Sequence, residues 1–211
     1  MTVVVDYGAS NIRSVLNAFE ELGEEVQVAS RPEALEAAER IVLPGVGAMA
    51  PAMARLREAG LDRALDRAVR ERRVPFLGIC LGMQMMCRRG NENGIETEGL
   101  GWIDGDVVRL GATPDWRVPN MGWSEVRFEE GAPLCRGLRQ DPTFYFCHSY
   151  HARLDDPRRS AATVEFDGSV TAAVWRGNAF GVQFHPERSG NLGQGLLEAF
   201  LEWDGGPAEA W

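Results

Sequence analysis

Apolar residues in the N-terminal part of the chain alternate between strand-like and helix-like spacing. A β-branched run at Val3–Val5 predicts a first strand. Apolar residues then recur at helical spacing, which predicts a helix over residues 11–22. Further strands are expected at 25–29, 40–43 and 76–79, a helix at 32–39, one or two helices within 51–73, and another helix at 81–87.

The C-terminal part carries mainly strand patterns. Strands are expected near 103–109, 121–127, 143–147, 161–166, 170–175 and 179–184, with a closing helix at about 192–203. Because strands and helices alternate in the first part, that part favours a parallel sheet with helices on both faces. The sequence therefore predicts one α/β domain over residues 1–203, with a mostly parallel or mixed central sheet flanked by helices, and a C-terminal tail at 204–211.

Composition narrows the possible functions. The 211 residues suit a single domain, and 45% hydrophobic and 25% charged residues are ordinary for a globular protein. The formal net charge of −9 argues against a nucleic-acid partner, because binding phosphates requires a basic face. The chain contains no lysine, which excludes a phosphate-loop lysine and a lysine Schiff base.

Cysteine usage indicates thiols rather than disulfides or metal ligands. The sequence has four cysteines, at Cys80, Cys87, Cys135 and Cys147. No two are spaced as CxxC, so a zinc or thioredoxin-like site is not expected. Neither a signal peptide nor an apolar run of roughly 18 residues is recognisable. We therefore expect a cytoplasmic protein with free thiols, no membrane contact, no metal and no cofactor.

The strongest chemical signal is the segment Gly78–Gly82, with Cys80 at its centre. It lies where a buried strand is expected to give way to a helix, which is the layout of a nucleophile elbow with Cys in place of Ser. Small flanking residues allow the tight turn, and free N–H groups at the start of the helix would stabilise a thiolate and an oxyanion. The alternative is a buried structural cysteine beside a glycine turn.

A base and an orienting acid follow in a second segment, Gln183–Glu187. His185 lies just past an apolar strand, and Glu187 is two residues further on, so both side chains share one side of an extended segment. A cysteine nucleophile needs such a base, and the base needs an orienting group. The alternative is an ordinary surface pair. His148 and His151 are three residues apart near a strand end, where their side chains should diverge, so they are poor co-ligands for a metal.

A third segment, Pro44–Gly47, offers hydrogen-bond donors for an oxyanion. Acyl-transfer chemistry needs two N–H groups where the oxyanion forms. The Leu81 N–H, next to the nucleophile, is one candidate, and the Val46 N–H in this glycine-rich turn is the other. A plain tight turn is the alternative.

In this order and spacing, the PGVG, GICLGMQ and QFHPE segments resemble the class I (triad) glutamine amidotransferases. Three further stretches narrow the resemblance to the glutaminase subunits of imidazole glycerol phosphate synthases; they are Asp6–Val15, Pro119–Trp123 and Tyr145–Tyr150. The resemblance runs from residue 3 to about 202 and implies a flavodoxin-like α/β fold of the class I amidotransferase type.

The resemblance also implies a division of labour. This chain would hydrolyse glutamine to glutamate and ammonia, with Cys80, His185 and Glu187 as the catalytic triad. A cyclase subunit with a (β/α)₈ barrel would form a heterodimer with it and use the ammonia in histidine biosynthesis. The residues that the resemblance assigns to glutamine binding are Gly47, Gly82, Gln84, His148, Ser149 and Tyr150. Gln84 is also plausible from its chemistry, because its amide could pair with the α-amino and α-carboxylate groups of glutamine.

The expected docking face for the cyclase contains Asn11, Arg13, Asn120 and Trp123. The alternative for these residues is a solvated loop and one buried aromatic. Two positions depart from the family pattern: Asn120 replaces the usual His before Met-Gly-Trp, and Arg188 replaces the usual Lys after the HPE segment. Both departures are expected to affect the partner face rather than the triad.

Other functions remain open at this point. The chain could serve a different triad amidotransferase, such as one for pyridoxal phosphate, anthranilate or carbamoyl phosphate synthesis. It could also be a non-catalytic relative that supports a partner, or a redox-sensing protein built around Cys80. The Asp6–Val15 and Pro119–Trp123 stretches argue against the first, the intact triad against the second, and the HPE segment against the third.

Overall fold

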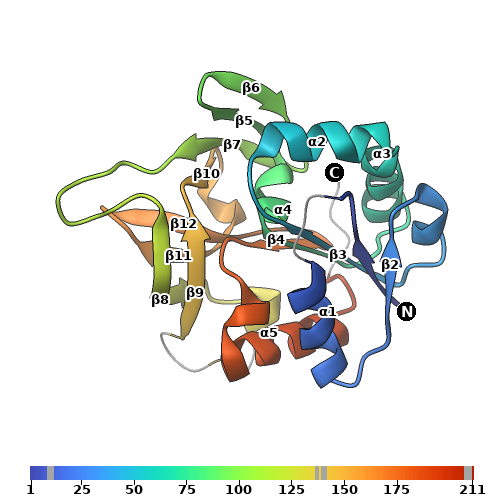
Figure 1. Ribbon diagram of the computed structural model, residues 1–211. Coiled ribbons are helices and arrows are strands. Elements are labelled where there is room, and N and C mark those ends of the chain that lie inside the picture. The colour runs from blue at the N-terminus through green and yellow to red at the C-terminus, as the bar shows by residue number, and fades with distance from the viewer. Residues whose placement is uncertain (9–11, 136–137, 139–141, 207–210) are drawn as a thin grey trace.

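The computed structural model describes residues 1–8, 12–135, 138, 142–206 and 211, and a central sheet organises them (Figure 1). The sheet has nine strands in the order β2-β1-β3-β4-β13-β12-β11-β8-β9. Its parallel half consists of β2 (Val26–Ala29), β1 (Thr2–Val5), β3 (Arg40–Gly45), β4 (Phe76–Cys80) and β13 (Ala179–Val182). Its antiparallel half consists of β12 (Ser169–Arg176), β11 (Ser160–Glu165), β8 (Asn120–Phe128) and β9 (Thr143–His148). The prediction of a mixed central sheet in an α/β fold is confirmed.

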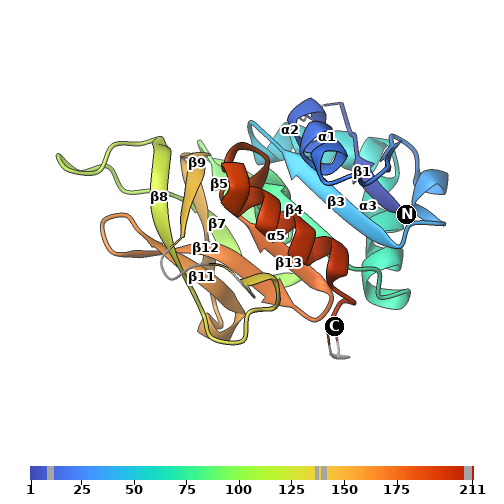
Figure 2. The ribbon, with the colours of Figure 1, turned by 90° about the horizontal axis from the view of Figure 1, so that it is seen from below.

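Helices cover both faces of the parallel half, as predicted. Figure 1 shows α2 (Met49–Glu58) and α3 (Leu61–Asp66) on one side, and α1 (Ile12–Glu21) and α5 (Gly190–Glu202) on the other. Figure 2, seen from below, shows α5 and α1 lying across the near face of the sheet. Successive residues of β3 explain why both faces need cover: Ile41 and Leu43 join the core under α2 and α3, whereas Val42 joins the core under α1 and α5.

Two of the predicted helices differ from the observed ones, and the range predicted to hold one or two helices contains two. The segment expected as a helix at 32–39 is a short 3₁₀ turn at Pro32–Leu35. The segment 51–73 is two helices separated by Gly60, which has φ +69°, and its end at Arg67–Glu71 is π-helical. The helix α4 stops at Met85 rather than residue 87, because the chain turns there into a strand.

A second sheet of four strands was not predicted. Its order is β10-β7-β5-β6, built from β10 (Tyr150–Leu154), β7 (Ile103–Arg109), β5 (Cys87–Glu92) and β6 (Ile95–Glu98). Only β7 was expected, because β5 and β6 contain mostly polar residues and lack the apolar alternation that indicates a strand. The Asn93-Gly94 pair between them, with φ of 53° and 84°, is a typical hairpin turn and was the available signal.

The last residue of the chain packs onto the domain. The Trp211 ring meets the edge of the buried Trp102 ring at 6.2 Å between centroids, and the Arg176 guanidinium lies 5.3 Å above the Trp211 ring. Trp211 thus adds to the apolar cluster that contains Trp102. In the part of the chain described here, no helix is both long and apolar enough to cross a membrane.

The segment after β13 is held in place by a close approach of two backbones. Helix α5 packs on the short turn Pro186–Arg188, and a side chain at Gly193 would overlap the Pro186 carbonyl oxygen. Only glycine therefore lets α5 lie this close to the turn. By contrast, a methyl group at Gly195, also within α5, would meet nothing within 4 Å.

Gly193→Ala is therefore expected to lower the melting temperature by several degrees. The added methyl group has to push two backbone segments apart, and such overpacking costs about 1–3 kcal/mol, with each kcal/mol worth about 2–4 °C at this chain length. The matched variant Gly195→Ala should raise the melting temperature slightly, since alanine is favoured over glycine within a helix by about 0.5–1 kcal/mol. Thermal unfolding followed by circular dichroism measures both. Equal effects of the two substitutions would contradict the close-approach argument.

Candidate active site

Cys80 lies at a strained turn between β4 and α4. Its φ of 54° and ψ of −106° are unusual for a residue with a side chain. The turn is possible because the chain packs tightly on itself: a side chain at Gly82 would overlap the Leu43 carbonyl oxygen, and one at Gly78 would come within 2.8 Å of the Gly82 backbone. This is the geometry of a nucleophile elbow, as the Gly78–Gly82 segment predicts.

The helix after the elbow is short. Helix α4 spans only Leu81–Met85. A helix dipole depends on several aligned turns, so five residues supply little of it. Electrostatic support for charge at Cys80 must therefore come from nearby N–H groups, such as that of Leu81, and from side chains.

The structure brings His185 and Glu187 to Cys80, as the sequence predicts. The Cys80 thiol influences the pKa of His185, and the His185 Nδ1 donates to Glu187 Oε1 at 2.8 Å. Both side chains are buried, with 7% and 6% of their surface exposed. The Ser189 hydroxyl donates to the His185 carbonyl oxygen at 2.6 Å and accepts from the Tyr145 N–H at 3.0 Å, which fixes this segment against β9.

The two neighbours also determine the charge of His185. Burial by itself lowers the pKa of His185, but hydrogen bonds and charge interactions with Cys80 and Glu187 outweigh burial and raise that pKa to about 10. Because Nδ1 faces Glu187, the Nε2 atom is left for the sulfur. The imidazole can thus take a proton from a thiol and return it to a leaving group.

Two buried glutamines extend this group of residues, and one of them was not predicted. The Gln183 Nε2 lies 3.6 Å from the Cys80 sulfur, and Gln183 is completely buried. Gln84, predicted to hold glutamine, donates from its Nε2 to Gln183 Oε1 at 3.0 Å and to the Tyr150 carbonyl oxygen at 2.8 Å. Its amide nitrogen is therefore engaged within the protein. The sequence signal for Gln183 was its position two residues before His185, on the same side of an extended segment.

His148 is buried beside the Tyr150 carbonyl group, which also accepts a hydrogen bond from Gln84. Its Nδ1 donates to the Tyr150 carbonyl oxygen at 2.9 Å, so its Nε2 accepts from Asn120 Nδ2 at 3.1 Å. Burial lowers the pKa of His148 to about 4, although the hydrogen bond to Tyr150 opposes this effect. The Asn120 departure therefore lies against a predicted substrate-binding residue. Ser149 follows, and its carbonyl oxygen accepts from the Leu110 N–H at 2.9 Å.

The Pro44–Gly47 turn lies beside the elbow. Gly45 pairs directly with Cys80 across the β3–β4 ladder, and the Val46 side chain is 43% exposed. Gly47 has φ +90°, which suits glycine alone among the common residues. The turn therefore lies one strand away from Cys80, and the oxyanion donor at Val46 stays a prediction.

A second unpredicted residue, Glu92, anchors the segment after this turn. Glu92 is buried, and its Oε2 accepts from the Met49 N–H at 3.0 Å at the start of α2. Burial raises the pKa of this carboxyl group, and the Met49 hydrogen bond partly opposes the rise. Its signal in the sequence was weak, because it lies in a polar segment with six other charged or polar residues nearby in β5 and β6.

The predicted docking residues lie on different elements of the fold. Asn11 lies outside the described residues. Arg13 is exposed on α1, and Trp123 is 58% exposed on β8, with its ring 6.1 Å from that of Tyr145. The Arg188 guanidinium lies 4.5 Å above the same Tyr145 ring. Of these exposed groups, Arg188 directly follows Glu187, whereas Arg13 lies in the first turn of α1 and Trp123 lies within β8.

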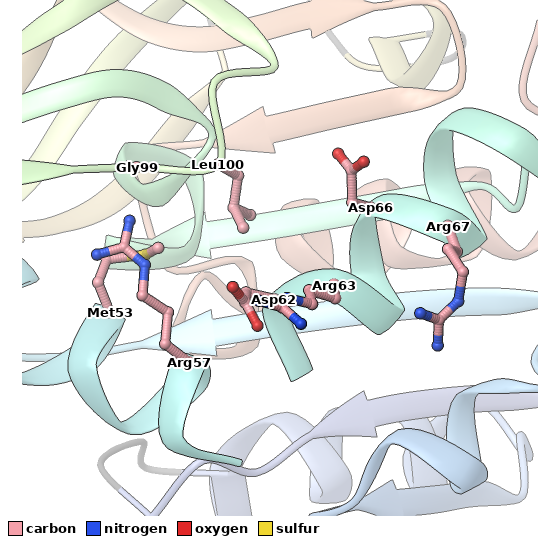
Figure 3. A pocket seen from close by; sticks show the side chains of 8 residues that line it. All are labelled: Met53, Arg57, Asp62, Arg63, Asp66, Arg67, Gly99 and Leu100. Atoms are coloured by element: carbon pink, nitrogen blue, oxygen red, sulfur yellow. The ribbon is translucent and has the colours of Figure 1, made fainter. Parts of the chain in front are cut away.

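Only some of the surface pockets border the predicted catalytic residues. A small cavity of about 30 Å³ borders His185 and Glu187 together with the Pro44–Val46 turn. A larger pocket of about 310 Å³ lies elsewhere, between α2, α3 and the β6–β7 connection, and shares no residue with the triad (Figure 3). Its mixture of arginines and aspartates is typical of a solvated groove between helices. Among the described residues, no cluster of His, Cys, Asp and Glu is arranged to hold a metal ion.

Comparisons with known proteins agree with this geometry. The sequence matches the family profile "Glutamine amidotransferase class-I" over residues 3–203. It is 43% identical over 202 residues to "Imidazole glycerol phosphate synthase subunit HisH 2" of Pseudomonas aeruginosa, covering 96% of this chain and 99% of that protein. It is 41% identical over 211 residues to "Imidazole glycerol phosphate synthase subunit HisH" of Agrobacterium fabrum, covering 95% and 97%.

Solved structures show the same fold at low sequence identity. The protein in "Structure of PurLQS from Thermotoga maritima" superposes with a TM-score of 0.75 at 20% identity, covering 95% of this chain and 97% of that chain. The protein in "Crystal structure of glutamine amidotransferase" superposes with a TM-score of 0.74, also at 20% identity and with the same coverage. These likenesses concern the fold alone.

The lowered pKa of His148 predicts how stability depends on pH. The unfolded chain binds a proton at His148 as the pH falls through 6.5, whereas the folded protein resists doing so until about pH 4. The stabilising contribution of neutral His148 is thus complete above pH 6.5 and is lost as the pH falls through this window, by at most about 3 kcal/mol.

Urea unfolding of the wild type and of His148→Gln between pH 4 and pH 7 measures this contribution. The variant has no group titrating at this position, so its free energy of unfolding should fall less steeply with acid than that of the wild type. Carboxyl groups titrate in both proteins, so their contribution cancels in the difference between the two free energies of unfolding. Parallel curves would show that His148 is protonated as easily in the folded protein as in the unfolded chain.

Proposed function

This chain belongs to the class I glutamine amidotransferase family, and we propose that it is the glutaminase subunit of an imidazole glycerol phosphate synthase. In this role it hydrolyses glutamine to glutamate and ammonia and serves histidine biosynthesis. Relatives about 40% identical over nearly the whole chain support this assignment over other triad amidotransferases, because their names agree on one enzyme. A scaffold without catalysis is disfavoured by the intact Cys80, His185 and Glu187 arrangement.

The observation that carries the proposal is that His185 interacts electrostatically with Cys80 while its Nδ1 is hydrogen-bonded to Glu187. His185 takes the proton of the Cys80 thiol, and the sulfur attacks the side-chain carboxamide carbon of glutamine. The oxygen of that group becomes an oxyanion. Protonated His185 then gives its proton to the departing nitrogen, ammonia leaves, and a thioester remains. Water, deprotonated by His185, attacks the thioester and releases glutamate and the thiol.

The raised pKa of His185 fits this sequence of proton transfers. An imidazole whose protonated form is stabilised by Glu187 is a ready proton acceptor, and it then holds the proton needed by the leaving nitrogen. Glu187 thereby orients the ring and compensates its charge without taking the proton itself.

Glutamine is proposed to bind beside the elbow, between the Pro44–Gly47 turn and the strand end at His148–Tyr150. The residues assigned to this task are Gly47, Gly82, Gln84, His148, Ser149 and Tyr150. Because the Gln84 nitrogen is engaged by the protein, we assign its Oε1 rather than its nitrogen to the substrate. Glu92 adds a buried acidic group near the start of α2, and such a group suits the α-ammonium of an amino acid.

The oxyanion is proposed to accept hydrogen bonds from the N–H groups of Leu81 and Val46. The Val46 peptide lies between two glycines, so it can rotate at little steric cost and turn its N–H toward or away from the oxyanion. Losing one such donor costs roughly 10²–10³ in rate. The turn can therefore act as a switch for hydrolysis.

The ammonia is proposed to pass to a cyclase subunit, a (β/α)₈ barrel that forms a heterodimer with this chain. Asn11, Arg13, Asn120 and Trp123 remain the proposed docking residues, and the net charge of −9 suits a partner rim with basic groups. We propose the reducing cytoplasm as the compartment, since the four cysteines are free and a catalytic thiol has to stay reduced.

Cys80→Ala is expected to abolish glutamine hydrolysis while leaving the fold intact, because the small thiol contributes little packing and no other group can replace the nucleophile. Glutamate release from glutamine, in the presence of the cyclase, measures the activity, and circular dichroism checks the fold. Cys135→Ala is the control, since Cys135 lies in a separate 3₁₀ turn, and it should retain most of the activity. Hydrolysis by purified Cys80→Ala would refute the nucleophile assignment.

The isolated chain is expected to be a poor glutaminase that the cyclase and its nucleotide ligand activate. Hydrolysis without an acceptor wastes glutamine, because free ammonia is protonated and diffuses away. Steady-state kinetics of the chain alone, with the cyclase, and with the cyclase plus ligand measure the activation. It should appear mainly in kcat, because the oxyanion exists only near the transition state. Full turnover by the isolated chain would exclude the switch, and activation confined to KM would instead place it in the glutamine pocket.

A further inference from the structure

Gln183 occupies the position next to Cys80 in the central sheet. Strands β13 and β4 run parallel, and Val182 pairs with Ile79, so Gln183 and Cys80 are the residues that follow on each strand. The Gln183 backbone is held from the other side, where its N–H donates to the Ala172 carbonyl oxygen at 2.8 Å. Its side chain is completely buried, and its Nε2 lies 3.6 Å from the Cys80 sulfur. Such an N–H···S contact is within hydrogen-bonding range because sulfur is larger than oxygen.

A second hydrogen bond decides which end of the Gln183 amide faces the sulfur. The Gln183 Oε1 accepts from Gln84 Nε2 at 3.0 Å. If the Gln183 amide were turned over, two NH₂ groups would face each other and its oxygen would lie against the sulfur. The Gln84 bond therefore fixes the Gln183 amide with its N–H groups toward Cys80.

Gln84 itself is held in one orientation. Its nitrogen also donates to the Tyr150 carbonyl oxygen at 2.8 Å, so both of its N–H groups are used. The same carbonyl oxygen accepts from His148 Nδ1 at 2.9 Å. A series of hydrogen bonds, part-buried at Tyr150 and buried beyond it, thus runs from the strand end at Tyr150 through Gln84 and Gln183 to the sulfur of Cys80. Each bond fixes the direction of the next.

We propose that Gln183 is a positioning residue of the nucleophile, whose amide N–H donates to the Cys80 sulfur, favours its thiolate form over the thiol and holds it in the orientation for attack. This inference rests on the proposed function, because it assigns Gln183 a part in the same thiol chemistry. A hydrogen bond donated to sulfur stabilises a thiolate more than a thiol, since the thiolate carries the charge. With a helix of only five residues behind the elbow, such a side-chain donor replaces support that a longer helix dipole would give.

Proton exchange with Cys80 and hydrogen-bond donation to its sulfur fall to two different residues of the Gln183–Glu187 segment. Gln183 and His185 are two positions apart, and both contact the same sulfur. His185 exchanges a proton with Cys80, whereas the Gln183 amide has no proton to give and can only donate a hydrogen bond. The sulfur is therefore held during the steps in which His185 carries its proton to the leaving nitrogen.

The test measures the sulfur directly, without turnover. In Gln183→Met the side chain keeps nearly its size and loses the donor. Alkylation of each cysteine by iodoacetamide, followed by mass spectrometry across pH 5 to 10, reports the thiolate at Cys80. In the variant, Cys80 should react about tenfold more slowly at neutral pH, with the rate profile displaced by about one unit to higher pH, since a hydrogen bond to a charged group is worth roughly that much. With the cyclase present, kcat for glutamine should fall while KM changes little.

A second variant replaces the hydrogen-bond donor at this position with an acceptor. In Gln183→Glu one oxygen can still accept from Gln84, and the other presents an acceptor to the sulfur in place of a donor. Cys80 should then react more slowly than in Gln183→Met, because an ionised carboxylate also repels the thiolate. This variant keeps the test decisive if the methionine variant is poorly folded.

Asn178→Leu is the matched control for loss of a buried amide. Asn178 is completely buried and donates to the Val69 and Val74 carbonyl oxygens at 2.8 Å, so its replacement should lower stability. It should leave the pH profile of Cys80 alkylation unchanged. An unchanged Cys80 profile in both Gln183 variants would overturn the proposal and leave Gln183 a packing residue. Slower alkylation in a chain that hydrolyses no glutamine would instead uphold the role of Gln183 and reject the proposed function.

Discussion

The site depends on how closely the carboxyl ends of three neighbouring strands approach one another. Where β3, β4 and β13 end, the backbone at Gly82 lies against the Leu43 carbonyl group with no room for a methyl group between them. This contact allows the chain to reverse at Cys80 and to hold it at an unusual φ. The strain is tolerated because β4, β13 and all but the first residue of β3 are buried, so these strands cannot move apart without exposing apolar surface.

From this contact, each strand end supplies one part of the chemistry. The end of β3 gives the glycine-rich turn, the end of β4 gives the thiol proposed as the nucleophile, and the segment after β13 gives the proposed base and its orienting acid. Ligands bind at this edge in open α/β sheets because the loops there converge. Helix α5 holds the third part in place through its close approach to Pro186.

The two buried histidines show how surroundings give one residue type opposite properties. His148 has neutral partners, and burial lowers its pKa to about 4, so it stays uncharged and acts as a fixed hydrogen-bonding group. Burial acts on His185 in the same direction, yet Cys80 and Glu187 overcome it and raise its pKa to about 10. The difference lies in the partners, and it separates a residue that fixes structure from one suited to moving protons.

The sequence by itself determined the α/β class, the parallel strands of the first part and the residues at their ends. Buried strands such as Val3–Val5 and Phe76–Ile79 are apolar throughout, and the Cys80 elbow and the His185–Glu187 pair are local patterns that need only a few residues to specify. Tertiary structure alone decided what depends on distant residues. The polar strand β5 forms because it pairs with β6 and β7, not because of its own pattern. Gln183 and Gln84 are 99 positions apart, and only folding shows that their hydrogen bond turns an amide toward the sulfur. Hydrophobic spacing reports which face of an element is buried, whereas the direction of a buried hydrogen bond is set by partners that the chain brings together only when it folds.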